Sequence, residues 1–257
     1  MLVQRHSCRT MTNKNPIDVT LVSGARPGLL QETLKSFSEK LFRHFPIATL
    51  YVNIDPFEGG QAEVEDCERI CREFFPTVVS RKPATSHFTR AVKWLWQQPR
   101  SAWCFHLEDD WILNRDVTYA EFSASMKWRV AQITLMTKEK NWGYRSPYHF
   151  EPDRFTILGK DLGKGLNKKR PVFTTSPSFV KREFAHQCSE LMSDTLDPEK
   201  QLNTLNPQLN QYTAKYRNRF IGKRREFVAV DIGRRHRDEI GLTKTVIEGN
   251  SVWTEDN

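Results

Sequence analysis

Three carboxylates in a row, Glu108, Asp109 and Asp110, follow directly on the largely apolar segment 103–107. Neighbouring carboxylates repel one another, so a protein keeps such a cluster where a cation or a set of hydrogen-bond donors neutralises it. Carboxylate oxygens are hard ligands that suit Mg²⁺ or Mn²⁺, which proteins often hold with one or two side chains and the phosphates of a substrate. The cluster therefore predicts a divalent-metal site.

The turn 24–28, Gly-Ala-Arg-Pro-Gly, is the second place where chemistry is expected. Its spacing is not the GxGxxG of a nicotinamide or flavin site, and it is not a P-loop. A nucleotide bound here would meet the main chain around Ser23 and Ala25 and the side chain of Arg26. The alternative interpretation is a plain tight turn.

Hydrophobic patterning places both sites in an alternating β-α-β arrangement. Strands are expected at 17–23, 47–54, 77–80 and 103–107, and helices at 29–42, 61–74 and 86–97. This order predicts a single Rossmann-like α/β domain with a mainly parallel central sheet flanked by helices. Ligands of such sheets bind outside the carboxyl ends of the strands. The segments 24–28, 53–60 and 108–111 therefore belong to one expected site.

The second half of the chain is less regular. We expect helices near 119–130, 178–192 and 198–217, strands at 132–137, 172–175 and 226–232, and a loop rich in Gly, Pro and Lys over 141–171. This half is expected to complete the site rather than to form a second domain.

Composition narrows the class of protein. No stretch approaches the roughly 20 apolar residues that a bilayer requires. Residues 1–16 are predicted to be a flexible leader without the apolar core of a signal peptide. The chain has 5 cysteines, an odd number, which indicates free thiols in a reducing compartment.

The net charge of +8 is concentrated in one segment. Residues 160–237 contain 17 Lys and Arg against 8 Asp and Glu, whereas the last 20 residues are acidic. A segment of this kind attracts a polyanion such as nucleic acid, a phosphorylated substrate or anionic lipid. The alternative is an ordinary solvated basic face.

The first half resembles the GT-A-fold glycosyltransferases, notably their large family two. The resemblance covers residues 17–115 and rests on three segments: VTLVSGARPGLLQETLKS at 19–36, YVNID at 51–55 and FHLEDDWI at 105–112. The last is similar to the D-x-D region of these enzymes, although it reads Glu-Asp-Asp. The resemblance implies a nucleoside-diphosphate-sugar donor, bound by the half 17–115, and Mn²⁺ or Mg²⁺ as cofactor. The half 116–257 would then bind the acceptor.

The resemblance also implies roles for single residues on the donor side. Asp55 would hold the nucleotide base, and Asp109 would contact the donor. Glu108 and Asp110 would be metal ligands, with Asp110 the best candidate.

Two later segments are assigned by the same resemblance. His236 would be a further metal ligand, and Arg234 and Arg235 would neutralise the departing diphosphate. A carboxylate at the start of a later helix would be the catalytic base, here Glu199 with Asp197 as the second candidate. The alternative for Asp-Pro-Glu at 197–199 is a capped helix start.

These observations favour a cytoplasmic glycosyltransferase, in the host cytoplasm if the source is viral, that acts on a polyanionic acceptor. The favoured acceptor is a hydroxymethylated base in DNA, a reaction that phages use to protect their genomes. The aromatic segment 142–150 would assist in flipping the base out of the duplex. Two alternatives stay open: a transferase of lipopolysaccharide or capsule synthesis, and a non-catalytic GT-A-like module that binds nucleic acid.

Overall fold

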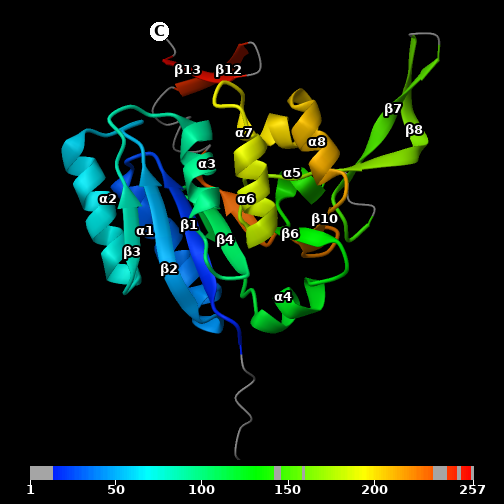
Figure 1. Cartoon of the computed structure of the whole chain (residues 1–257). Coiled ribbons are helices and arrows are strands. Elements are labelled where there is room, and N and C mark those ends of the chain that lie inside the picture. Colours follow the sequence, from blue (N-terminus) through cyan, green and yellow to red (C-terminus); the bar gives the residue numbers. More distant parts are fainter. Residues whose placement is uncertain (1–13, 142–145, 158–159, 234–241, 248–249, 256–257) are drawn as a thin grey trace, which may run out of the picture.

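A central sheet of seven strands organises the chain (Figure 1). The computed structural model describes residues 14–141, 146–157, 160–233, 242–247 and 250–255. Across the sheet the strands are β10 (Arg217–Ile221), β6 (Val130–Leu135), β9 (Ser178–Lys181), β4 (Trp103–Glu108), β1 (Ile17–Ser23), β2 (Ile47–Ile54) and β3 (Val78–Arg81). Only β9 pairs antiparallel with its neighbours in this sheet. The expectation of a mainly parallel sheet is therefore confirmed.

Helices cover both faces of the sheet, as Figure 1 shows. One face carries α1 (Pro27–Lys40) and α2 (Gln61–Phe74), and the other carries α3 (Phe88–Gln97), α6 (Arg182–Leu191) and α8 (Pro207–Thr213). The side chains between these layers form two buried clusters, one on each face. The cysteines in the described residues, Cys67, Cys71, Cys104 and Cys188, are buried free thiols, in agreement with the sequence.

The inner strands β1, β2 and β4 of the first half are largely buried because helices pack on both sides, whereas the edge strand β3 is half-buried to exposed. All seven residues of β1 are buried. Pro27 starts α1 at the position where a missing backbone N–H costs no hydrogen bond. These elements agree with the predicted ones to within a few residues, so the turn 24–28 is fixed between a buried strand and a helix that packs one face on the core.

The second half differs from its prediction most in four places, while the expected helix 119–130 ends already at Ser125 and the expected strand 226–232 covers only Ala229–Asp231. The expected loop 141–171 contains an antiparallel pair, β7 (Phe150–Ile157) and β8 (Lys160–Pro171), which projects from the body in Figure 1. The expected strand 172–175 is irregular, and the strand lies at β9 instead. The expected helix 178–192 therefore begins only at Arg182. The expected helix 198–217 is replaced by α7 (Pro198–Lys200), the π-helical turn Gln201–Leu205, α8 and the start of β10.

Shorter elements complete the chain. They are the 3₁₀ turn Phe42–His44, α4 (Tyr119–Ser125), α5 (Lys138–Asn141), the pair β5 (Trp111–Leu113) and β11 (Ala229–Asp231), and the hairpin of β12 (Leu242–Ile247) and β13 (Asn250–Glu255). Among the helices that the structure describes, none has the length and the hydropathy needed to cross a bilayer.

Candidate active site

A cavity of about 780 Å³ opens at the carboxyl ends of β1, β2 and β4. All three segments that the sequence assigned to this edge contribute to it, through Gly24, Asp55 and Asp110 among others. Of the described residues that line it, eight are carboxylates: Asp55, Glu108, Asp109, Asp110, Asp194, Asp197, Glu199 and Asp231. The volume is typical of a site for a small organic ligand. Because the lining is rich in carboxylates, a cation bound in the cavity would be stabilised by their negative charges.

Asp109 is buried and turned toward the first strand. Its Oδ2 accepts hydrogen bonds from Ser23 Oγ at 2.9 Å and from the backbone N–H of Gly24 at 2.8 Å. Its Oδ1 accepts from the guanidinium of Arg26. The Asp109 carboxylate therefore ties the acidic segment to the turn 24–28. The predicted donor contact of Asp109 remains a prediction, but the structure gives this side chain a supporting position.

The same turn holds Ala25 in the left-handed region, with φ of 55°. A residue with a Cβ adopts this conformation at a cost of about 1–2 kcal/mol, so the surrounding contacts must enforce it. The Ala25 side chain is buried and is not among the residues that line the cavity. Any contact of Ala25 with a ligand would therefore be made by its main chain.

Arg26 reaches across the acidic segment. Its Nη2 lies 3.2 Å from Asp110 Oδ2, and its Nη1 lies 3.4 Å from Glu58 Oε1. Burial lowers the pKa of Arg26, but the negative charges of Asp109 and Asp110 outweigh this effect and hold the pKa above its usual range. The Arg26 Nε–H is buried without a hydrogen-bond partner among the described residues. A buried donor of this kind suits an anionic ligand.

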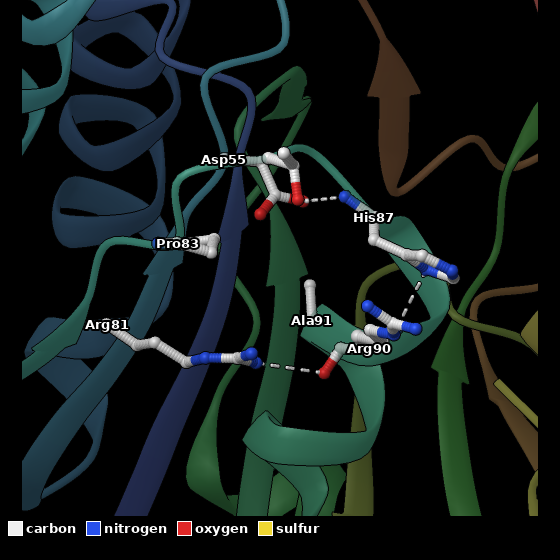
Figure 2. Close-up of a pocket in the computed structure, with 7 residues that line it drawn as sticks. Asp55, Arg81, Pro83, His87, Arg90 and Ala91 are labelled. Carbon is white, nitrogen blue, oxygen red and sulfur yellow. Dashed lines mark hydrogen bonds between the residues drawn. The ribbon is translucent and has the colours of Figure 1, made fainter.

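Asp55, at the end of β2, borders both the large cavity and a smaller one of about 50 Å³ (Figure 2). Its carboxylate accepts hydrogen bonds from Asn53 Nδ2 at 2.8 Å and from the backbone N–H of His87 at 3.2 Å. Burial raises the pKa of Asp55, although both hydrogen bonds oppose the shift. Figure 2 shows Arg81 and Arg90 on the far side of the small cavity. This end of the site therefore combines one carboxylate with two arginines.

Glu199 and Asp197 both line the large cavity, as a catalytic role would require. Asp197 also caps α7, because its Oδ1 accepts the backbone N–H of Lys200 at 3.0 Å, and Pro198 occupies the first helical position. The alternative interpretation of this segment as a capped helix start is therefore correct for Asp197. The geometry leaves Glu199 as the better candidate base.

The negative charges converge on Glu108. Burial of its carboxyl group raises the pKa well above the usual value, and the negative charges of Asp110, Glu199, Asp109 and Asp231 raise it further. Asp231 was missed by sequence reasoning. It lies on β11 opposite Trp111, and the backbone N–H of the next residue, Ile232, donates to the backbone carbonyl of Asp110 at 2.8 Å. Its place at the end of the predicted strand 226–232 could have indicated a site residue.

Lys140, on α5, was also missed. Its Nζ donates to Ser176 Oγ at 2.6 Å, and Ser176 lines the cavity. Burial lowers the pKa of Lys140, whereas the charges of Glu199 and Glu108 oppose the shift. The lysine is thus a cation at the border of the acidic cavity. Nothing in the apolar pattern of the sequence marks it.

The chain is similar to known proteins in its structure and not in its sequence. No protein-family model and no curated protein sequence matches the chain. The mannosyltransferase PcManGT from Pyrobaculum calidifontis, solved with GDP-Man and Mn²⁺, is similar over 82% of this chain and 56% of its own, with a TM-score of 0.55 and 9% identity. Residues 1–349 of S. aureus TarS are similar over 83% of this chain and 59% of their own, with a TM-score of 0.51 and 14% identity.

GalNAc-T7, solved with UDP, GalNAc and Mn²⁺, gives a TM-score of 0.54 and 15% identity, covering 81% of this chain and 42% of its own. These three structures are GT-A-fold glycosyltransferases. The chain has the GT-A fold. It spans about half the length of the structures it matches, between 42% and 59%.

The GT-A fold implies a divalent metal, and the donor set in the cavity fits one in part. Carboxylate oxygens of Glu108, Asp110 and Asp231 are hard ligands that suit Mn²⁺ or Mg²⁺. Within the described part of the chain, however, no three His, Cys, Asp or Glu side chains are grouped closely enough to hold an ion by themselves. One or two of these carboxylates would therefore need further oxygen ligands, such as those of a bound substrate, to hold a metal ion.

Several predicted site residues lie outside the described part of this GT-A fold. Arg234, Arg235 and His236 belong to the range 234–241, and residues 142–145 of the predicted aromatic segment are outside it as well. The roles proposed for these residues remain predictions. Tyr148 and Phe150, the described aromatics of that segment, place their ring centroids 6.0 Å apart.

Proposed function

We propose that the chain is a metal-dependent glycosyltransferase that moves a sugar from a nucleoside-diphosphate sugar to a hydroxyl acceptor. The observation that carries the proposal is one cavity at the carboxyl edge of a GT-A sheet that joins the acidic segment, the turn 24–28, Asp55 and Glu199. The solved complexes of PcManGT with GDP-Man and Mn²⁺ and of GalNAc-T7 with UDP, GalNAc and Mn²⁺ support this class of donor.

The donor would lie across the cavity with its base toward Asp55 and its diphosphate toward Arg26 and Asp110. The buried Nε–H of Arg26 and the buried Nε1–H of Trp111 are both without a partner among the described residues, and both residues line the cavity. They are suitable donors to phosphate oxygens. Asp110, with Glu108 or Asp231, would hold Mn²⁺ or Mg²⁺ together with oxygens of the donor. A bound metal supplies Lewis-acid stabilisation of the charge that develops on the leaving diphosphate.

Glu199 would act as the general base. Its carboxylate would accept the proton of the acceptor hydroxyl while that oxygen forms a bond to the anomeric carbon and the bond to the diphosphate breaks. Lys140 lies near enough to Glu199 and Glu108 for their charges to act on its pKa.

For the acceptor we propose a hydroxymethylated base in DNA. The charge distribution supports this: the second half holds the basic excess, while the cavity itself is acidic. With Arg26 and the metal taken up by the donor diphosphate, the remaining carboxylates would repel a phosphodiester, so the duplex would remain outside and only an extruded, uncharged base would enter. This acceptor implies a reaction in the cytoplasm.

The donor half is tested first by thermal stability with a panel of nucleoside diphosphates and nucleotide sugars, each with and without Mn²⁺. We expect a rise in melting temperature that needs both the metal and one nucleotide, because a ligand that binds the folded state stabilises it. Asp110→Asn should abolish the rise. Asp116→Asn, the same change at a surface ion pair with Arg43, should leave it intact. A panel without any such rise would contradict the proposal.

The acceptor is tested by transfer of a labelled sugar, from the donor so identified, to DNA that contains hydroxymethylated bases. Unmodified DNA of the same sequence is the control. We expect transfer to the modified DNA alone, and its loss by at least 100-fold in Glu199→Gln. Transfer to a lipid or oligosaccharide acceptor instead would keep the enzyme class and refute the DNA acceptor.

A further inference from the structure

A series of aromatic and arginine side chains lies along β10, outside the cavity. It consists of Arg129, Trp128, Arg217, Tyr148 and Arg219, and we call it the β10 ladder. Trp128 is 76% exposed, the largest exposed fraction of any large hydrophobic side chain in the described residues. An isolated exposed aromatic is unremarkable in a folded protein, but one flanked by arginines is a typical nucleic-acid contact.

The rings and the guanidinium groups alternate. The guanidinium carbons of Arg129 and Arg217 lie 5.2 Å and 6.0 Å from the Trp128 ring centroid. Those of Arg217 and Arg219 each lie 5.4 Å from the Tyr148 ring centroid. Cation–π contacts of this kind hold an arginine in place while leaving most of its N–H donors available.

The backbone fixes the arrangement. Tyr148 forms an antiparallel bridge with Arg219, and the N–H of Arg217 donates to the Arg129 carbonyl at 2.8 Å. Arg129 has a φ of 62°, so the turn before β6 holds a side-chain-bearing residue in the left-handed region. The ladder is thus held by a sheet edge and a tight turn rather than by a loose loop.

The ladder lacks negative partners. Within the described residues no carboxylate forms an ion pair with its three arginines, Arg129, Arg217 and Arg219, and the sequence contains no Asp or Glu between Glu199 and Glu226. Arg217 and Arg219 face the same Tyr148 ring, so their like charges repel each other. A bound polyanion would relieve this repulsion.

Position separates the ladder from the catalytic cavity. Arg217 begins β10, whereas the cavity lies at the carboxyl edge of β1 and β4, which run parallel to β6 and β10. Five residues of strand span about 17 Å. A polymer that follows β10 from Lys215 toward Lys223 would therefore run toward the cavity edge.

From these observations we infer that the β10 ladder is a docking surface for a nucleic-acid strand with unstacked bases. The arginines would contact phosphates, and Trp128 would stack on a base. The inference adds a DNA-binding surface to the proposed function, and its biological meaning rests on that proposed function. The binding itself does not depend on catalysis.

The test is fluorescence anisotropy with a labelled 12-nucleotide single-stranded DNA between 50 and 300 mM salt. Arg217→Ala with Arg219→Ala should weaken binding about tenfold and make the slope of log K against log salt shallower by about 1.4. Trp128→Ala should weaken binding about tenfold with little change in slope, and Trp128→Phe should retain most of the affinity. Arg69→Ala with Arg72→Ala removes two exposed arginines from α2 and should change the affinity less than twofold.

Three results would overturn the inference. They are no binding of DNA at 50 mM salt, an equal effect of the β10 and α2 double variants, and binding to vesicles of anionic phospholipid without binding to DNA. The donor-dependent rise in melting temperature should be the same in the β10 variants as in the wild type, since these residues do not line the cavity. If neither the wild type nor the variants show this rise in melting temperature but the wild type binds DNA, the proposed enzyme would be refuted and the β10 ladder would still be a DNA-binding surface.

Discussion

At the scale of single residues, two cations of different kinds balance the acidic cavity. Arg26 forms ion pairs with Asp109 and Asp110, so its charge neutralises the acidic segment that contacts the turn 24–28. Lys140 is instead hydrogen-bonded to a neutral hydroxyl, that of Ser176, and acts on the carboxylates through space. Removal of Arg26 would break a buried network, whereas removal of Lys140 would change mainly the local potential.

This difference leads to a prediction for Lys140→Met. Removing a positive charge beside Glu108 and Glu199 increases the attraction of the cavity for a divalent cation, because the remaining charges act through a partly buried medium. We expect the apparent affinity for Mn²⁺, measured by calorimetry in the presence of the nucleotide, to rise at least threefold. Lys138→Met, at an exposed position on the same helix, is the control. An unchanged or weaker Mn²⁺ affinity in Lys140→Met would show that the lysine does not act on the metal site.

At the scale of elements, the donor side of the cavity depends on contact between two loops. The N–H of Asp55 donates to the carbonyl of Ser23 at 2.8 Å, and that of Glu58 donates to the carbonyl of Gly24 at 3.2 Å. A Cβ on Gly59 would lie 2.5 Å from the carbonyl oxygen of Ala25. Only a glycine therefore allows the loop 55–60 to approach the turn this closely.

Gly59→Ala should accordingly push the two loops apart. We expect the free energy of unfolding to fall by about 1–3 kcal/mol, measured by urea denaturation, and the nucleotide-dependent rise in melting temperature to shrink. Gly28→Ala is the matched control, because a Cβ there meets no atom within 4 Å and lies within α1. That variant should be neutral or slightly more stable. Equal stability of the two variants would mean that the loops can part without cost.

The elements of the first half could be predicted from the sequence, because the inner strands are apolar and largely buried and each helix shows an apolar face at helical spacing. The pattern fails for β10, a five-residue edge strand that begins with Arg, Asn and Arg: its first residue fell in the expected helix 198–217, and the others were assigned to no element. It fails for β8 because its sequence, rich in lysine and glycine, has no apolar face to bury.

The candidate site was predicted where it follows directly from strand ends, as for Glu108, Asp110 and Asp55. Asp231 was missed because its strand has three residues and pairs with β5, more than 100 residues away in the chain. No local pattern reports that contact. Lys140 was missed for a related reason: its neighbours Ser176 and Glu199 come from segments that the sequence does not link to it.

At the scale of the whole molecule, one sheet joins both halves of the chain. Strand β9 from the second half pairs with β4 from the first, and it carries Phe179 into the centre of the core. The Phe179 ring centroid lies 4.8 Å from that of Phe105 on β4 and 4.5 Å from that of Phe122 on α4. The two halves therefore share aromatic contacts as well as hydrogen bonds.

This sharing predicts that the halves unfold together. Denaturant unfolding followed by circular dichroism and by tryptophan fluorescence should give coincident single transitions. Phe179→Ala should lower the free energy of unfolding by about 3–5 kcal/mol and keep the two transitions coincident, because the cavity it leaves weakens both halves at once. Phe227→Ala, which truncates a 39% exposed phenylalanine, should cost less than about 1 kcal/mol. Separate transitions in the wild type, or in Phe179→Ala alone, would mean that the donor half is stable without the rest and that β9 only docks against it.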